Sequence, residues 1–401
     1  MDLREIVQTD RILERDYWVG LLTKNGVPKL NFPTGLIPSQ DHDALRKQAR
    51  QLLELLRDAH AINEEFLEDF SMPANTVSQF PLGSMQTLIE DFLASGSLIT
   101  LPVEHFRRDA PGPIRWNRTL QSQIPLPNTR RRLVYPHFIS SKKSLNDDFL
   151  ISQIHAYCLA ISFENLGWLY TSSRPELNVP YLNVELFRHQ IEKTLSQTFN
   201  DRDLTILKCL KSIIDWVAND SQASIQSYGT SHFDVIWEHL VDTIFGIKNK
   251  ADYYPSTAWH TLEDSSSHKN RSLMPDSIML HQGKIFILDA KYYSYGITNN
   301  PDNLPGSADI NKQITYGDFV ELKYGGPPLF NVFLLPGRTH SIFESQFYSS
   351  ASWIEAPKPH QRVHAVIFDT TTALESYASG NTRHLKELLA QTVETASANF
   401  R

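Results

Sequence analysis

The sequence contains few cysteines and no long apolar run. Cys158 and Cys209 are the only cysteines among 401 residues, and no Cys-x-x-Cys spacing occurs. The sequence therefore indicates neither a disulfide framework nor a structural zinc site. No apolar run approaches the ~20 residues of a membrane span, and the charged first residues lack the apolar core of a signal peptide. We expect no membrane partner and a cytoplasmic protein in a reducing compartment.

Internal repeats, low-complexity tracts and glycine-rich loops that could cradle a phosphate are also absent from the sequence. The last absence argues against a motor that hydrolyses nucleotides by itself. The hydrophobic content of 41% is that of an ordinary globular chain, and the length allows two or three domains.

One region is strongly basic, although the whole chain has a formal net charge of -7. Residues 101–145 hold nine Lys or Arg against two acidic residues, a net of +7, so the remainder sums to -14. Such a block suits a polyanion, because neutralising phosphates releases condensed counterions, and its aromatic residues suit stacking on nucleic acid. A solvated surface is the alternative. The expected DNA contacts are Arg107, Arg108, Arg115, Trp116, Arg118, Arg130, Arg131, Arg132, Lys142 and Lys143.

The most informative stretch covers residues 274–292, where two short apolar strands flank a turn that contains glycine. If the turn has three residues, Asp276 lies opposite Leu288 or, with a one-residue bulge, opposite Asp289. Asp289 and Lys291 are two positions apart on one strand and therefore face the same side. The sequence thus predicts two carboxylates close to one ammonium group.

Such a set can support metal-assisted phosphodiester hydrolysis. Mg²⁺ binds one or two carboxylates and takes waters and phosphate oxygens as further ligands. It lowers the pKa of a bound water and neutralises charge on the phosphoryl group. Lys291 could position the attacking water or deprotonate it, because the pKa of a lysine falls when the side chain is desolvated. In the alternative interpretation, Asp276 and Asp289 only end strands and Lys291 is solvated.

A second acidic-x-Lys triplet occurs at residues 321–323, with Asp309 upstream. The residues before this triplet are spaced like a helix, so we favour the first candidate. In the first candidate, residues 284–288 form a near-continuous apolar run, which is typical of a central strand covered on both faces.

The flanking sequence predicts a sheet and helices around this hairpin. Residues 232–246 have the pattern of an amphipathic helix, with Glu238 at the edge of its buried face. Residues 329–336 and 364–369 read as strands, and a closing helix begins near residue 372. This order favours a mixed sheet flanked by helices.

The Pro-Asp pair that ends at Asp276, followed by Asp289-Ala290-Lys291, resembles the PD-(D/E)xK nuclease superfamily. The resemblance implies that Glu238 adds a third carboxylate to the metal site. It also implies that Gln313 and Tyr316, on the helix after the hairpin, face that site. An ordinary surface role for Glu238 and a packing role for Gln313 and Tyr316 remain the alternatives.

The pattern Gly-x-Ile-x-Trp-x-x-Thr over residues 112–119 looks like the signature of the LlaJI-type restriction endonucleases. That family shares a nuclease plan with the McrC subunit of methyl-directed restriction systems. Pro113 is a local departure that stiffens the motif. Together, the matching motifs cover roughly residues 95–370.

We therefore expect an α/β (α+β) protein. Residues 1–225 would form a mainly helical DNA-recognition region that includes the basic block at 101–145. Residues 226–401 would form a restriction-endonuclease-like mixed β-sheet flanked by helices. The long first region leaves room for a domain that reads the DNA sequence.

The resemblance implies a restriction endonuclease that makes Mg²⁺-dependent, site-specific cuts in double-stranded DNA, with Mn²⁺ as a substitute. A homodimer on DNA is expected, since palindromic sites match two-fold symmetry. A cognate methyltransferase and a separate AAA+ NTPase subunit are the other expected partners.

Other functions stay open at this point. Within enzymes, the alternatives are the nuclease subunit of a McrBC-like NTP-dependent complex and a repair nuclease specific for DNA structure. Outside enzymes, they are a recognition subunit with an inactive nuclease fold and a structural interaction protein. The intact Asp276, Asp289 and Lys291 count against an inactive fold.

Overall fold

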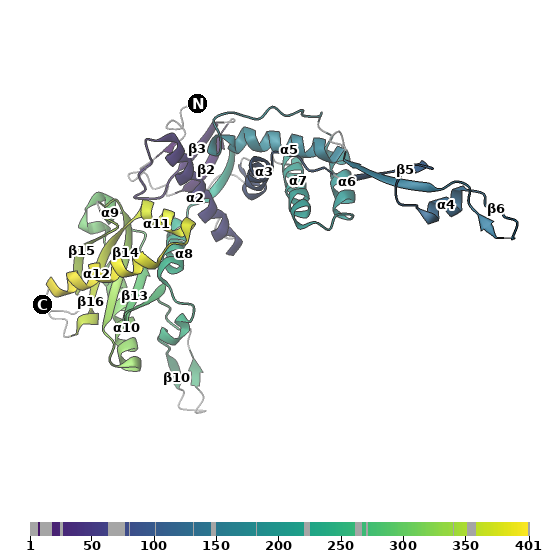
Figure 1. Cartoon of the computed structure of the whole chain (residues 1–401). Coiled ribbons are helices and arrows are strands. Elements are labelled where there is room, and N and C mark those ends of the chain that lie inside the picture. Colours follow the sequence, from purple (N-terminus) through teal and green to yellow (C-terminus); the bar gives the residue numbers. More distant parts are fainter. Residues whose placement is uncertain are drawn as a thin grey trace. The chain divides into compact units, whose positions relative to one another are not determined.

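The chain folds into two compact units in the computed structural model (Figure 1). Unit 1 consists of Met1–Gln79 and Ala223–Arg401, and unit 2 of Phe80–Gln222. The second boundary lies beside the predicted boundary at residue 225, whereas the first 79 residues group with the C-terminal part. The structure describes residues 7–8, 18–24, 27–62, 77–79, 81–100, 102–130, 132–145, 150–181, 183–219, 225–260, 267–269, 272–339, 341–350 and 358–399.

The main sheet of unit 1 has five strands in the order β12-β13-β14-β16-β15. The central strands β13, β14 and β16 are parallel, and both edge strands are antiparallel to their neighbours. This is the predicted mixed sheet, with β15 as an additional strand. The strands are β12 (Ser277–His281), β13 (Lys284–Ala290), β14 (Leu329–Gly337), β15 (Phe343–Ser350) and β16 (Arg362–Asp369).

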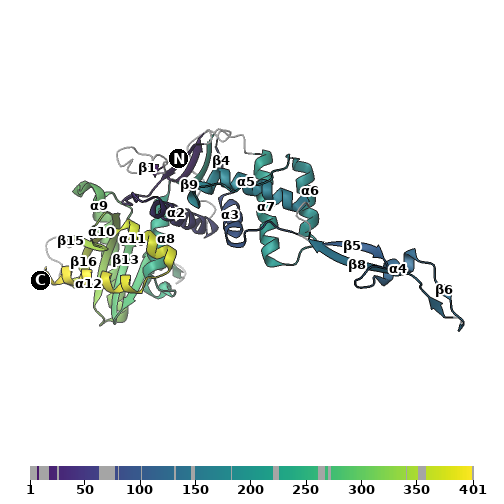
Figure 2. The same cartoon turned by 45° about the horizontal axis from the view of Figure 1, so that its top comes forward.

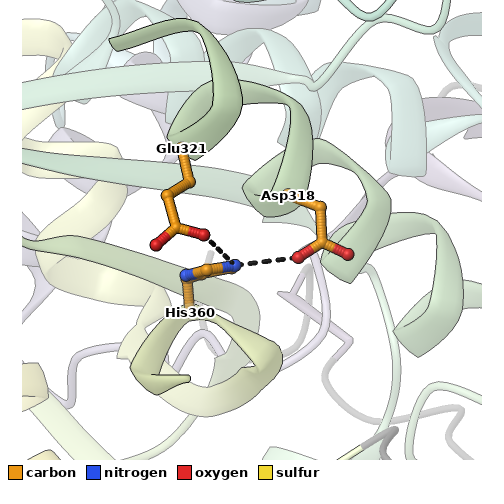
Figure 3. A group of neighbouring side chains, drawn as sticks. All are labelled: Asp318, Glu321 and His360. Carbon is orange, nitrogen blue, oxygen red and sulfur yellow. Dashed lines mark hydrogen bonds and ion pairs between the residues drawn. The ribbon is translucent and has the colours of Figure 1, made fainter. Parts of the chain in front are cut away.

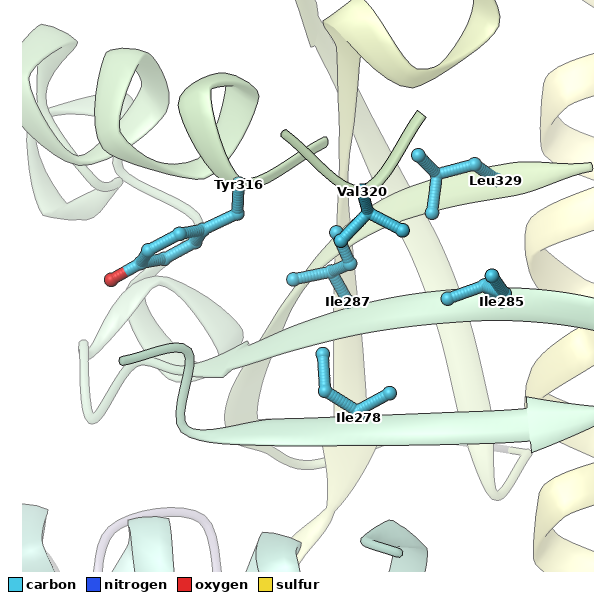
Figure 4. Packing of buried hydrophobic residues seen from close by; sticks show 6 residues of the cluster. All are labelled: Ile278, Ile285, Ile287, Tyr316, Val320 and Leu329. Carbon is cyan, nitrogen blue, oxygen red and sulfur yellow. The ribbon is translucent and has the colours of Figure 1, made fainter. Parts of the chain in front are cut away.

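Helix α10 (Ser307–Tyr324) covers one face of this sheet. A buried cluster there joins the helix to three strands (Figure 4); it contains Ile278, Ile285, Ile287, Tyr316, Val320 and Leu329. Fully burying one such aliphatic side chain contributes about 1.5–3 kcal/mol. Because alternate strand residues face opposite sides, Asp289 lies on the same face as Ile287, toward α10.

Helix α8 (Phe233–Phe245) packs on the opposite face of the sheet. The rings of Trp237 and Phe245 both contact Phe368 of β16, whose neighbour Ile367 faces α10. The helix ends at Gly246, and its predicted apolar stripe is buried. Helices α11 (Thr370–Ser379) and α12 (Arg383–Asn399) complete the unit, so the predicted flanking helices and fold class are confirmed.

The hairpin β12-β13 has a tighter turn than the sequence suggested. Residues 282–283 have φ values of 48° and 73°, the left-handed pair that a two-residue type I′ turn requires. Ser277 consequently pairs with Leu288, and the next position places Asp276 level with Asp289 without a bulge. The expected register was wrong by one residue because the turn contains two residues rather than three.

A second five-stranded sheet in unit 1 has the order β1-β3-β2-β9-β4. Its strands are β1 (Val7–Gln8), β2 (Val19–Lys24), β3 (Val27–Asn31), β4 (Val77–Gln79) and β9 (Ile225–Thr230). Helix α2 (His42–Ile62) contacts strand β2 of this sheet. The backbone N–H of Thr34 donates to the Tyr292 hydroxyl at 2.8 Å. The N-terminal segment therefore contacts the chain directly after Lys291.

Unit 2 consists of packed helices and a long ribbon (Figure 2). The helices are α3 (Leu82–Ser95), α5 (Leu150–Leu166), α6 (Val184–Leu195) and α7 (Asp201–Asn219). Strands β5 (Pro102–Arg108) and β8 (Ile139–Leu145) form an antiparallel ribbon that leads away from them and carries α4 (Trp116–Ser122), β6 (Leu126–Pro127) and β7 (Leu133–Val134). We call residues 102–145 the arm, and it coincides with the basic block.

The remaining short elements of unit 1 lie between the larger ones. They include β10 (Ala258–His260), β11 (Ser267–Lys269) and α9 (Tyr295–Thr298). Within the described ranges, no helix is both long enough and apolar enough to span a membrane.

Candidate functional site

Asp276, Asp289 and Lys291 meet at the carboxyl end of β13. The Asp289 side chain is 2% exposed, and its Oδ2 lies 2.7 Å from Lys291 Nζ. Asp276 Oδ2 accepts a hydrogen bond from the backbone N–H of Ala290 at 2.7 Å. The hairpin thus brings the three predicted residues together where β12 begins and β13 ends.

The carboxyl groups of Asp276 and Asp289 lie in a site with more acidic than basic neighbours. Burial, followed by the charges of Asp289 and Glu238, raises the pKa of Asp276 to about 8. Asp289 Oδ1 is buried and has no hydrogen-bond partner among the described residues. Leaving a buried polar group unsatisfied costs about 1–3 kcal/mol, and more for a charged one. Either a proton on Asp276 or a divalent cation would relieve this cost, so the pair fits Mg²⁺.

Lys291 is held between two carboxylates. Its Nζ lies 2.7 Å from Asp289 Oδ2 and 3.2 Å from Asp309 Oδ1. Burial alone lowers the pKa of Lys291, but the two carboxylates outweigh burial and raise it. The side chain is therefore a cation at neutral pH in this arrangement, which suits positioning a water or phosphate rather than deprotonating water.

Asp309 is one site residue that the sequence did not predict. It lies in the first turn of α10, where it also accepts a hydrogen bond from the Tyr293 hydroxyl at 3.4 Å. In the sequence, Asp309 is noted only as the acidic residue upstream of the rejected triplet at residues 321–323. That triplet lies in α10, as its helix-like spacing predicted. No local pattern signals the pairing of Asp309 with Lys291, because the two belong to separate elements.

Glu238 lies on the exposed side of α8, close enough to sense the carboxylate pair. Burial, followed by the charges of Asp234 and Asp289, raises the pKa of Glu238. Trp237 Nε1 donates to the backbone oxygen of Leu334 at 3.1 Å, and the Lys291 backbone N–H donates to the same oxygen at 2.9 Å. Helix α8 is thus anchored to the strand end where the candidate site lies.

Gln313 and Tyr316 are buried on α10 and brace the backbone beside the site. Gln313 Nε2 donates to the Ile287 carbonyl at 2.8 Å, and the Tyr316 hydroxyl donates to the Met274 carbonyl at 3.1 Å. Each hydrogen bond holds the backbone two residues before a candidate aspartate. Both side chains can therefore hold Asp276 and Asp289 in place through the backbone.

Lys312 is a further cation that the sequence reasoning did not assign to the site. Its Nζ lies 5.7 Å from the centre of the Tyr316 ring. Burial lowers the pKa of Lys312, but a hydrogen bond with Tyr316 and the charge of Asp289 outweigh burial and raise it. Two lysines thus flank the carboxylate pair.

The Gly-x-Ile-x-Trp-x-x-Thr motif over residues 112–119 shapes the backbone of the arm. Gly112 has φ +143°, and a Cβ there would lie 2.3 Å from the Ser141 backbone oxygen. The Pro113 carbonyl accepts from the Ser141 N–H at 3.0 Å, so proline's missing N–H is not needed. Buried Thr119 accepts from the Ile139 N–H at 3.0 Å and ties α4 to β8. The motif therefore sets how α4 sits on the ribbon.

The arm presents its basic side chains to solvent. Trp116 is 52% exposed, and the Arg118 guanidinium lies 3.8 Å from the centre of the Phe106 ring. These residues line a shallow depression of about 430 Å³. Exposed arginines of the predicted set are Arg107, Arg108, Arg115, Arg118, Arg130 and Arg132. Arg131 and the side chains of Lys142 and Lys143 fall outside the described residues.

Comparison with known proteins gives a family and two relatives. The family model described as LlaJI restriction endonuclease matches residues 18–352. The Type II restriction enzyme BsuMI component YdjA of Bacillus subtilis is 27% identical over 261 residues, which cover 59% of this chain and 55% of that protein. This chain therefore spans about half the length of that relative.

A likeness to one solved structure is weaker. It is described as the refined half-complex from the tetradecameric assembly of Thermococcus gammatolerans McrB AAA+ hexamers with bound McrC. The TM-score is 0.43 at 11% identity, with 90% of this chain and 81% of the other covered.

Proposed function

The chain belongs to the LlaJI restriction endonuclease family, and from that premise we propose that it cleaves double-stranded DNA by Mg²⁺-dependent phosphodiester hydrolysis. The observation that carries the proposal is the buried pair Asp276 and Asp289 beside Lys291. One buried oxygen of that pair lacks a partner among the described residues, and burial raises the pKa of Asp276 to about 8. A site with this excess of negative charge favours a divalent cation over a neutral ligand.

Each residue has a distinct role in the proposal. Asp276 and Asp289 would hold Mg²⁺, or Mn²⁺ in its place, with Glu238 as a third carboxylate. A metal ion bound there lowers the pKa of a water and neutralises charge on the phosphoryl group. Lys291, fixed by Asp289 and Asp309, positions the water and a phosphate oxygen by its charge. Gln313 and Tyr316 are positioning residues, since their hydrogen bonds run to the backbone.

The arm is the proposed DNA-binding surface. The arginines of the arm that the structure describes are exposed, and a guanidinium in solvent can bind a phosphate without breaking a buried ion pair. Trp116 is half exposed and offers a stacking face beside Arg118. The arm would thus supply affinity, while the carboxylate site supplies cleavage.

Site-specific double-strand cleavage also implies an assembly. One active site cuts one strand at a time, so we propose that two copies act together on a two-fold symmetric site. A cognate methyltransferase would protect the host copy of that site.

The decisive experiment is digestion of a large unmethylated DNA by the purified chain, with Mg²⁺ and with EDTA. Discrete fragments are expected only from the unmodified protein with Mg²⁺, and not from Asp289→Asn or Lys291→Ala. Asp318→Asn is the matched control, because it changes an acidic side chain of α10 at the end that does not face Asp289. Equal cleavage by the Lys291→Ala protein would refute the proposed site.

DNA binding is tested separately with the cleavage-deficient Asp289→Asn protein. Arg118→Ala and Arg132→Ala are each expected to weaken binding and to reduce the slope of log affinity against log salt by about 1. A salt slope that does not change in either variant would remove the arm from the DNA-binding surface.

A second candidate function is a nuclease component that cuts only within a larger complex. The related protein is itself named a component of a restriction enzyme. The arm also exposes apolar side chains that DNA phosphates would not use, with Ile124 82% and Leu133 66% exposed. Cleavage that requires both a nucleoside triphosphate and an NTPase subunit would favour this function. Preference for flaps or junctions over duplex sites would instead indicate a structure-specific repair nuclease.

A further inference from the structure

Three side chains with metal-binding atoms converge at the far end of α10 (Figure 3). Asp318 and Glu321 come from the second half of this helix, and His360 from the turn Pro359–Gln361 before β16. Their ligand atoms all lie within 4.8 Å of one another. His360 Nε2 lies 2.9 Å from Asp318 Oδ1 and 3.3 Å from Glu321 Oε2. Two separate elements thus deliver one imidazole nitrogen and two carboxylate oxygens to one place.

This cluster lies at the opposite end of the sheet from the candidate active site. Strands β13, β14 and β16 are parallel, and Asp289 is near the carboxyl end of β13. His360 precedes the first residue of β16, so it lies at the amino ends of the same strands. The two groups of carboxylates therefore do not belong to one metal centre.

The surroundings of the cluster fix the three ligands. The His360 ring is almost fully buried, and Gln361 Nε2 donates to Asp318 Oδ1 at 3.2 Å. A Cβ at Gly317 would lie 2.6 Å from Asn331 Nδ2 and 3.1 Å from His360 Cδ2. Glycine at this position therefore lets α10 approach the turn closely enough for both carboxylates to reach the imidazole. Such outer contacts are what orient the ligands of a metal.

The cluster also borders a cavity. Glu321 and His360 line a cavity of about 460 Å³, together with Lys284, Glu394 and Leu329. Water could enter this cavity and complete the coordination of an ion, because three protein ligands leave a fourth position free.

We propose that Asp318, Glu321 and His360 form a second metal site, which binds Zn²⁺ in preference to Mg²⁺. An imidazole nitrogen with two carboxylates suits Zn²⁺, whereas Mg²⁺ takes oxygen ligands. The carboxylate-only set of Asp276 and Asp289 has the opposite preference. The ligand nitrogen is His360 Nε2, which binds Zn²⁺ only when it carries no proton.

The bound ion would tie α10 to the turn that begins β16. The same helix carries Gln313 and Tyr316, which brace the candidate active site. The second site therefore stabilises the folded state through mass action, because the unfolded chain does not bring the three ligands together.

The test is a Zn²⁺ titration of the metal-stripped 401-residue chain against a chromophoric chelator, with millimolar Mg²⁺ present to fill oxygen-only sites. One tightly bound Zn²⁺ per chain is expected. Asp318→Asn and Glu321→Gln, both at partly exposed positions, should each weaken Zn²⁺ binding at least ~100-fold, since loss of outer partners alone costs 10–100-fold. Asp289→Asn should leave Zn²⁺ binding unchanged.

Lys358→Gln is expected to strengthen Zn²⁺ binding, whereas the other two substitutions weaken it. Lys358 Nζ lies 2.6 Å from Glu321 Oε2 and competes with a metal for that oxygen. Its removal should tighten Zn²⁺ binding several-fold, and Co²⁺ substitution should give a visible spectrum that Asp318→Asn abolishes. Failure of the unmodified protein to bind Zn²⁺, or Zn²⁺ binding that survives Asp318→Asn but not Asp289→Asn, would overturn the proposal. Neither readout depends on DNA cleavage.

Discussion

Two carboxylate clusters of contrasting character lie near the two ends of α10. At the first end, Asp289 is 2% exposed, and burial beside other carboxylates raises the pKa of Asp276. At the second end, the side chains of Asp318 and Glu321 are 50% and 38% exposed, and both contact His360. The first cluster is buried with too few cations, whereas the second is partly solvated and paired.

This contrast shows that surroundings, and not residue type, decide what a carboxylate cluster can do. In a buried site the electrostatic attraction between a divalent cation and carboxylates is stronger than in water. The same site can stabilise charge that develops on a phosphate. A solvated, paired cluster offers less electrostatic gain, and its selectivity depends on the imidazole nitrogen. The predictions below test this division of roles between the two ends.

The largest expected effect is loss of cleavage at the first end. Lys291→Ala removes the cation that positions water and phosphate, and Asp289→Asn removes a metal ligand. Each should lower the initial rate of plasmid cleavage by about 10³-fold, within the range for groups that act directly in the transition state. DNA affinity, measured in parallel by fluorescence anisotropy, should change little. A comparable loss of DNA binding would mean that the substitutions act on DNA binding rather than on chemistry.

The second prediction concerns pH. The pKa of Asp276 in the folded state, about 8, lies above the ordinary value of 3.8 for this carboxyl group, so the folded protein holds an extra proton between these two pH values. Metal-free stability should therefore fall as pH rises through this window. Mg²⁺ must displace that proton, so cleavage at low Mg²⁺ should rise ~10-fold per pH unit up to about pH 8 and then level off. Asp276→Asn should abolish the stability trend, and Asp318→Asn should retain it.

The third prediction separates Lys291 from its second carboxylate. Asp309→Asn removes one of the two charges that raise the pKa of Lys291 and loosens its side chain. The cleavage rate should fall roughly 10-fold, the lower end of the range for outer partners of a site. Initial rates of plasmid cleavage at matched protein and Mg²⁺ concentrations measure this change. A loss as large as that of Lys291→Ala would instead make Asp309 a direct participant.

The fourth prediction concerns the braces on α10. Tyr316→Phe keeps the ring in the buried cluster but removes the hydrogen bond to the Met274 carbonyl. The free energy of unfolding should fall by about 0.5–1.5 kcal/mol, the net worth of one such bond. Urea denaturation measures this change, with unchanged slope. A stability loss without any loss of cleavage would limit Tyr316 to packing.

The smallest effect is expected at the second end. Asp318→Asn alters a half-exposed carboxylate, and such ion pairs contribute about 0–1 kcal/mol. Plasmid cleavage with Mg²⁺ alone should stay within about twofold of the unmodified protein at matched stability. A large loss of cleavage in this variant would contradict the division of roles between the two clusters, because it would place the second cluster in the hydrolytic reaction.

The sequence predicted the elements around the first cluster well. The apolar run at residues 284–288 forms the buried strand β13, and the stripe along residues 233–244 forms the buried side of α8. These predictions rest on local periodicity, which the side-chain geometry of strands and helices imposes directly.

Two features of unit 1 differ from what the sequence predicts. The polar composition of residues 219–231 predicts a linker or surface loop, but residues 225–230 form β9. That expectation was wrong because β9 pairs with β2 and β4, and backbone pairing does not require an apolar sequence. The hairpin register also differs by one residue from the predicted one. Gln282 adopts the positive φ of a type I′ turn, which an asparagine or glycine at this position would have indicated in the sequence.

The sequence by itself determined the types of the main elements, the basic charge of the arm and the proximity of Asp289 to Lys291. Tertiary structure alone decided that Asp309 pairs with Lys291 and that His360 meets Asp318, 42 residues away along the chain. The physical reason is that both contacts depend on how α10 packs against the sheet. That packing is set by the buried cluster between helix and strands rather than by the residues that make the contacts.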